Sequence, residues 1–123
     1  MPDPRHALGI RAEAAAAEWL AARGWAIHAR RWRCAAGELD LVARDPDQVV
    51  VAIEVKLRRT DRAGSGLDSV DRRRLLRLRA ALGCFVAEAG LPTHHGIRID
   101  LVVLRRGDDG QWRLSHHRGI DAW

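Results

Sequence analysis

Two short stretches of alternating sequence carry the charged side chains that could form a catalytic centre. Glu38 and Asp40 are two residues apart in the first stretch, and Glu54 and Lys56 are two residues apart in the second. If both stretches are β-strands, each pair lies on one face of its strand, and the four charges share one sheet. Carboxylate oxygens are the ligands that Mg²⁺ and Mn²⁺ prefer in proteins. A bound divalent metal ion would therefore explain why these charges lie together.

The chemistry of each group assigns its role within such a centre. Asp40 and Glu54 would hold the metal ion, the carbonyl of Val55 is a candidate third ligand, and Lys56 would position or activate the attacking water. Lys56 is the one lysine among 21 Lys and Arg residues, and an ammonium moves a proton more easily than a guanidinium does. The alternative is a partly exposed Glu54–Lys56 salt bridge on the solvent side of a hairpin, which alternation alone favours.

Seven elements in the order αβββαββ are expected to position these residues. The two charged stretches are strands joined by a turn at residues 45–47, so they form an antiparallel hairpin. A polar loop over residues 58–66 leads to a helix that Asp68 or Ser69 would cap and that ends near Ala89. The expected helices span residues 5–23 and about 69–89, and the expected strands span 25–32, 38–44, 49–57, 97–104 and 111–115, the first of them at the sheet edge.

Periodicity within these elements predicts which side chains are buried. Strict alternation places Leu39, Leu41 and Ala43 together on one face of their strand. In the first helix, apolar residues recur at Ile10, Ala14, Ala17 and Ala21. The second helix has a buried face of Leu75, Leu78, Leu82 and Phe85, and Arg72, Arg73, Arg77 and Arg79 lie off that face.

Two segments around the candidate centre resemble the PD-(D/E)xK nuclease superfamily. These are GELDLVARD at residues 37–45 and VVVAIEVKLRR at residues 49–59, with thirteen residues between Asp40 and Glu54. Over nearly its whole length the chain is similar to the bacterial YraN (UPF0102) family of predicted endonucleases, which are distantly similar to archaeal Holliday junction resolvases. The opening GIRAEAAAAEWLAARGWAI, the basic helix after the loop, the IDLVV segment and the final GIDAW also match in order.

This resemblance implies a fold, a site and a substrate. The fold would be a restriction-endonuclease-like α/β fold, with a mixed sheet flanked by the two helices and the acids at one sheet edge. Asp40, Glu54 and Glu13 would bind Mg²⁺ or Mn²⁺, and Lys56 would be the catalytic lysine. The activity would be phosphodiester hydrolysis in DNA, on branched or otherwise structured substrates. Glu13 as a solvent-exposed acid on an Ala-rich helix remains the alternative for that residue.

The charge balance favours a polyanionic partner. The formal net charge is +5 with a pI near 10.8, and cationic side chains bind phosphates by releasing counterions. DNA is favoured over RNA, and Trp32, among neighbouring arginines, is a candidate for stacking on bases. Two rival functions are a non-catalytic nucleic-acid-binding or assembly protein with the same fold and a protein-interaction module. The arginines expected to line one basic surface are Arg58, Arg59, Arg62, Arg72 and Arg73.

The remaining composition limits the class of protein. A hydrophobic fraction of 47% and a charged fraction of 30% predict one globular domain over residues 1–123, and exclude a disordered or fibrous chain. No apolar run is long enough to cross a bilayer and the start does not resemble a signal peptide, so a cytoplasmic protein without a membrane partner is expected. Cys34 and Cys84 are expected to be reduced, and the pairs at 94–95 and 116–117 to be solvated loop histidines. A homodimer is among the compatible assemblies.

Overall fold

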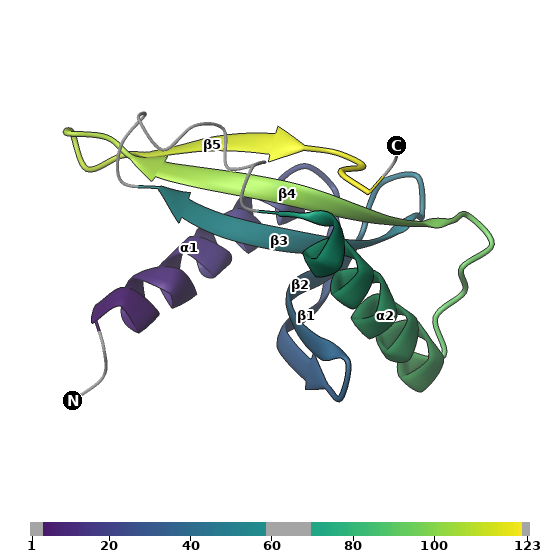
Figure 1. Ribbon diagram of the computed structural model, residues 1–123. Helices are drawn as coiled ribbons and strands as arrows, with labels where there is room; N and C mark the ends of the chain where they lie inside the picture. Colours follow the sequence, from purple (N-terminus) through teal and green to yellow (C-terminus); the bar gives the residue numbers. More distant parts are fainter. Residues whose placement is uncertain (1–3, 59–69, 122–123) are drawn as a thin grey trace.

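The computed structural model describes residues 4–58 and 70–121, and the elements within them follow the predicted αβββαββ order (Figure 1). Most of the predicted polar loop lies outside the described residues. No helix in the described part of the chain is both long and apolar enough to span a bilayer. The elements are α1 (Pro4–Ala21), β1 (Ala26–Cys34), β2 (Gly37–Arg44), β3 (Val50–Arg58), α2 (Arg72–Ala89), β4 (Ile97–Arg106) and β5 (Trp112–His117).

The five strands form one mixed sheet in the spatial order β1-β2-β3-β4-β5. Neighbouring strands are antiparallel except β3 and β4, which are parallel because α2 supplies the crossover between them. The first five residues of β3 are buried, as expected for a central strand covered on both faces. This mixed sheet flanked by helices confirms the predicted restriction-endonuclease-like architecture, with β1 at the edge as expected.

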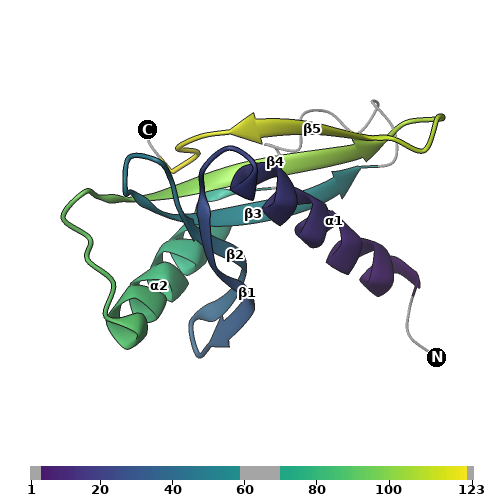
Figure 2. The same ribbon diagram turned by 180° about the vertical axis from the view of Figure 1, so that it is seen from behind.

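The two helices cover opposite faces of the sheet, as the front and back views show (Figures 1 and 2). On one face, α1 packs Ala12, Ala16, Ala17 and Leu20 against the sheet. The buried stripe of α1 is therefore offset from the predicted one, and Ile10 is 44% exposed. The prediction was wrong because an Ala-rich helix has apolar residues on every side, so periodicity does not select the packed face.

The second helix covers the other face with the predicted stripe. Leu75, Leu78, Leu82 and Phe85 are all buried there, together with Ala81. Its cap differs from the prediction, because Asp71 is the N-cap and its side chain accepts from the amide of Arg74 at 2.8 Å. Asp71 has an extended backbone, with φ −84° and ψ 176°, and the helix begins at the next residue, whereas Asp68 and Ser69 lie outside the described residues. Gly90 ends the helix with a φ of 65°, a left-handed conformation that favours glycine.

The β1–β2 hairpin leaves the plane of the other strands and projects between the two helices (Figures 1 and 2). Leu41 and Ala43 pack on the α1 face as predicted, but Leu39 packs with the α2 cluster. Alternation fails at this point because β2 pairs with β3 only from Leu41 onward, and Arg31, on the partner strand β1, has a φ of 51°. The hairpin is thus twisted toward α2 at its tip.

The far end of the sheet is tied by a buried polar network around Asp100. This carboxylate is fully buried and accepts from the Arg98 guanidinium at 2.7 Å, from the amide of Gly119 at 2.9 Å and from His116 at 2.8 Å. Burial alone would raise the pKa of Asp100, but the hydrogen bonds from His116, Arg98 and Gly119 hold it below its usual range. His116 therefore lies on β5, hydrogen-bonded to Asp100, and the prediction of a solvated loop histidine was wrong.

The C-terminal segment packs back on the sheet. The amide of Ile120 donates to the carbonyl of Ile99 at 2.9 Å, and Asp121 accepts from the amide of Ile99 at 3.2 Å. The Asp121 carboxylate also pairs with Arg79 on α2. These contacts fix the C-terminal segment against both α2 and β4.

Candidate metal centre and nucleic-acid interface

The predicted acids meet where β2 and β3 separate. The ladder between these strands ends at the pair Leu41–Ile53, so Asp40 and Glu54 come next in register. Beyond the ladder, the Val55 amide donates to the side chain of Asp40 instead of to a backbone carbonyl of β2, with 2.9 Å between the amide nitrogen and Oδ2. Because β3 is the central strand, these acids lie in the middle of the sheet, and the predicted position at a sheet edge was wrong. The error arose because a hairpin motif does not reveal with which strand the two later strands pair, and in the structure β4 pairs with the free side of β3.

The Asp40 carboxyl is held in an environment that disfavours its charge. Burial, the largest cause, and the negative charge of Glu54 together raise the pKa of Asp40 to about 8. The hydrogen bond from the Val55 amide opposes it. Asp40 therefore keeps its proton at neutral pH, and a cation bound beside it would favour the charged form instead.

Glu54 is buried and carries two cationic neighbours. Its side chain is 3% exposed, and the Nζ of Lys56 lies 3.6 Å from its Oε1. The second neighbour, Arg74 on α2, donates to both carboxylate oxygens, with Nη2 at 3.0 Å from each and Nε at 3.2 Å from Oε2. An ion pair between Glu54 and Lys56 is thus present as one alternative expected, but Glu54 faces the interior between β3 and α2, away from solvent.

Arg74 is the functional candidate that sequence reasoning missed. It precedes Leu75 and lies one helical turn before Leu78, which places it on the sheet-facing side of α2. Arg72, Arg73 and Arg77 are off that side and exposed, as predicted. The helical period therefore contained the signal that one arginine of the basic run points inward.

Glu13 on α1 approaches the same region from the other side of the sheet. Burial raises the pKa of Glu13, opposed by Arg31 and reinforced by the charges of Glu38 and Glu54. The side chain is 15% exposed, and its Oε2 lies 4.0 Å from Nη1 of Arg31. This oxygen is buried and, within the described residues, accepts no hydrogen bond. Glu13 is thus a largely buried acid with a spare acceptor oxygen, not a solvated one. It lies near the point where β2 and β3 separate at Asp40 and Glu54, which we call the fork.

The donor set fits a small oxygen-ligated cation in part. Among the described residues, no three His, Cys, Asp or Glu side chains converge closely enough to hold a metal ion as they stand. Asp40 and Glu54 supply two carboxylates at neighbouring register positions, and Mg²⁺ commonly binds through one or two carboxylates with water in its other positions. Glu38 stays outside the fork, where its carboxylate pairs with Arg33 across the hairpin at 3.1 Å.

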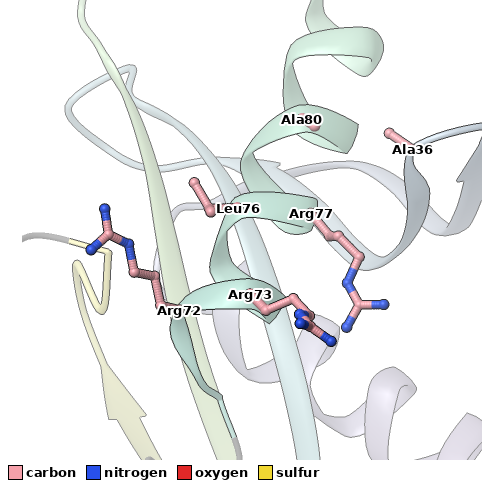
Figure 3. A pocket seen from close by; sticks show the side chains of 6 residues that line it. All are labelled: Ala36, Arg72, Arg73, Leu76, Arg77 and Ala80. Carbon is pink, nitrogen blue, oxygen red and sulfur yellow. The ribbon is translucent and has the colours of Figure 1, made fainter.

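A shallow basic hollow lies on the outer face of α2, beside its first turns (Figure 3). Its volume is about 580 Å³, and Leu76, 57% exposed, lies within it. Arg73 and Arg77 reach in the same direction, and Arg72 reaches to the other side of Leu76 (Figure 3). None of these three arginines forms an ion pair with an acid in the described part of the chain. The hollow is lined by Ala36, Arg72, Arg73, Leu76, Arg77 and Ala80.

The other predicted nucleic-acid-binding residues do not join this hollow. Arg58, at the end of β3, lines a separate hollow with Leu57 and Trp112, and its Nε is buried without a hydrogen-bond partner among the described residues. Arg59 and Arg62 lie outside the described residues. Trp32, predicted as a stacking candidate, packs edge-on against Phe85 with 5.2 Å between ring centroids. Trp32 faces the α2 cluster because the twisted hairpin turns it inward beside Leu39.

Comparison with known proteins places the chain in a family. Residues 12–104 match the model described as "Uncharacterised protein family UPF0102", a span that contains every residue of the fork and Arg74. A UPF0102 protein of Roseiflexus castenholzii is 41% identical over 107 residues, covering 87% of this chain and 86% of that protein. Another, of Beutenbergia cavernae, is 39% identical over 116 residues, covering 94% and 97%. A third, of Pseudomonas putida, is 40% identical over 111 residues, covering 90% and 83%. The chain therefore belongs to the UPF0102 family.

Proposed function

We propose that this protein is a divalent-metal-dependent endonuclease that hydrolyses phosphodiester bonds in DNA. The observation that carries the proposal is the position of the Asp40 and Glu54 carboxyl groups, which are next in register where the β2–β3 ladder ends and interact strongly enough to raise the pKa of Asp40. Burying two acids together is unfavourable unless a cation or a proton compensates them. The preference for branched or otherwise structured DNA rests on the sequence resemblance to resolvases.

The residues of the fork would divide the work by position. Asp40 and Glu54 would hold Mg²⁺ or Mn²⁺, and Glu13 has the spare buried oxygen that would add a third carboxylate. The ion would supply charge stabilisation for the phosphate and lower the pKa of water beside it. Lys56 extends from β3 next to Glu54, and its 28% exposed ammonium is placed to orient a water or a phosphate oxygen.

The basic hollow on α2 supports a nucleic-acid substrate. Arg72, Arg73 and Arg77 have no acidic partner among the described residues, so their charges are available for phosphates. Arg74, on the same turn of α2 as Arg73, reaches the fork. A strand bound along the hollow would therefore pass close to Glu54, which links the binding surface to the acids.

Cleavage assays test the proposal directly. Branched, flapped, duplex and single-stranded DNA should be incubated with Mg²⁺, with Mn²⁺ and with EDTA, using wild type and Asp40→Asn. Cleavage that requires the metal and disappears in Asp40→Asn is the expected result. Cleavage of equal rate in wild type and Asp40→Asn would reveal a contaminating nuclease. No cleavage of any substrate, together with no binding of Mn²⁺, would reject the proposal.

A non-catalytic nucleic-acid-binding protein is the second candidate, and Arg74 is the observation that favours it. The guanidinium already compensates the charge of Glu54, so the fork is stable without a metal ion. Such a protein would bind DNA with strong salt dependence through the basic hollow. It would bind equally well with Mg²⁺ or EDTA and would cleave nothing.

A further inference from the structure

We infer that Arg74 is a resident counter-ion that competes with divalent cations for Glu54, so that the metal site opens only when this guanidinium leaves. The inference rests on the proposed function and adds a means of regulating the same site. Arg74 would be a positioning residue: it acts on the metal through Glu54 and does not take part in bond cleavage.

The first argument is the completeness of the contact. The guanidinium of Arg74 donates three hydrogen bonds of 3.0 to 3.2 Å to Glu54, and both carboxylate oxygens accept at least one of them. A Mg²⁺ ion binds carboxylate oxygen at about 2.1 Å and uses the same lone pairs. Coordination by Glu54 therefore requires at least part of this bidentate contact to break, and the positive charge of Arg74 also repels the ion.

The second argument is that Arg74 can leave without disturbing the fold. Its side chain is 37% exposed, whereas Glu54 is 3% exposed, so one partner reaches solvent and the other does not. The position of α2 is set independently by the buried Leu75 and Leu78 and by the Asp71 cap. A rotamer change at Arg74 thus moves the charge and leaves the helix in place.

The third argument is the destination of the released guanidinium. Arg73, the preceding residue, reaches into the basic hollow with Arg77 (Figure 3). A phosphate bound there would lie beside the helical turn that carries Arg74 and would offer this guanidinium a second bidentate partner. Nucleic acid would then favour metal binding by drawing Arg74 away from Glu54, and the two ligands would bind cooperatively.

A structural ion pair that only fastens α2 to β3 is the competing explanation. Both explanations predict that loss of Arg74 destabilises the protein. They differ in metal affinity, because removing a mere fastener gives no gain in affinity, whereas removing a competitor does. Metal affinity measured without any substrate is therefore the decisive quantity.

The experiment measures Mn²⁺ binding by electron paramagnetic resonance of free Mn²⁺, at one fixed pH, for wild type, Arg74→Gln, Arg74→Lys and Arg73→Gln. Arg73→Gln is the matched control, since it makes the same charge change in the same helical turn on an exposed side chain. We expect Arg74→Gln to bind Mn²⁺ roughly tenfold more tightly than wild type, the factor typical of removing one competing charge-assisted hydrogen bond. The Mn²⁺ affinity of Arg73→Gln should stay within about twofold of wild type. Arg74→Lys keeps the positive charge but loses the bidentate guanidinium, so its Mn²⁺ affinity should lie between those of wild type and Arg74→Gln.

The outcomes separate this inference from the proposed function. Equal Mn²⁺ affinity in wild type, Arg74→Gln and Arg73→Gln would overturn the competition and leave the metal site intact. Absence of Mn²⁺ binding in all four proteins would overturn the proposed function itself. If Arg74→Gln is too unstable to titrate, the rise in melting temperature on adding Mn²⁺ is compared between wild type and Arg74→Lys. A smaller rise in Arg74→Lys would then count against the competition.

Discussion

The raised pKa of Asp40 predicts that Asp40→Asn stabilises the folded protein at neutral and alkaline pH. In the wild type the folded state holds a proton on Asp40 up to about pH 8, whereas the unfolded chain releases it near 3.8. Between these values the folded state binds more protons than the unfolded state, so stability falls as pH rises. Asparagine is a neutral isostere that does not titrate: its oxygen can accept from the Val55 amide and its nitrogen can donate to Glu54.

The magnitude follows from this linkage. One proton bound only in the folded state changes stability by about 1.4 kcal/mol per pH unit, so the interval from pH 5 to pH 8 has an upper limit of about 4 kcal/mol. Asp40 keeps some contact with solvent, which reduces its desolvation. We therefore expect the stability advantage of Asp40→Asn to grow by about 2 kcal/mol over that interval and to level off above pH 8.

Urea denaturation followed by tryptophan fluorescence measures this difference, since Trp25 is 5% exposed in the folded core. Subtracting the wild-type curve at each pH removes the contribution of all other titrating groups. Asp108→Asn, on an exposed turn, is the matched control and should show a constant difference. If the difference in unfolding free energy between Asp40→Asn and wild type does not change between pH 5 and pH 8, Asp40 does not hold the proton assigned to it. Addition of Mn²⁺ at pH 8 should stabilise wild type and leave Asp40→Asn unchanged.

Three further predictions concern Lys56, Asp100 and the basic hollow. Lys56→Ala and Lys56→Arg should both abolish metal-dependent cleavage while leaving DNA affinity within about threefold of wild type. The arginine variant should fail because a guanidinium cannot replace an ammonium that orients water. Wild-type turnover in Lys56→Arg would leave Lys56 only a salt-bridge role. Asp100→Asn should cost about 3 kcal/mol at pH 7, since it removes the charged acceptor of His116 and one of the two anions that pair with Arg98, the other being Asp45. The loss should shrink as the pH falls below the usual aspartate pKa, because the unfolded wild-type chain then takes up a proton while the folded-state pKa of Asp100 lies lower still; urea titrations at pH 7 and pH 3 check this. Replacing Arg72, Arg73 and Arg77 together by Gln should reduce the magnitude of the slope of log DNA affinity against log salt concentration by about 0.9 for each lost phosphate contact. Fluorescence anisotropy in EDTA measures this slope, and an unchanged slope would mean that DNA does not bind at the basic hollow.

The sequence predicted the order of elements because each carries a local signal. Strand alternation, the Asp45 turn and the α2 stripe are properties of a few neighbouring residues. The structure bears out these elements, and the family assignment agrees with the resemblance on which the site residues were chosen. The catalytic and metal-binding roles of those residues remain predictions.

The errors have a common physical origin in contacts between distant segments. The side of β2 on which Leu39 packs depends on where the β2–β3 ladder stops, which no periodicity within β2 encodes. His116 looked like a loop histidine until the strand that carries it was paired with β4, next to Asp100. Arg74 looked like its neighbours in a basic run, and only the position of β3 beneath α2 gives it a buried carboxylate as partner.

Asp100, which is fully buried in the sheet, shows how this protein stabilises a carboxylate that is purely structural. Asp100 is fully satisfied: a guanidinium, a histidine and a backbone amide donate to it, and these hydrogen bonds lower its pKa. Asp40 faces another acid, accepts one backbone amide, and has a raised pKa. The same chain can therefore stabilise a buried carboxylate, and at the fork it leaves one without a cation of its own. An arrangement that costs stability in the resting protein persists where a ligand compensates it, which is the strongest physical argument for a cation entering between Asp40 and Glu54.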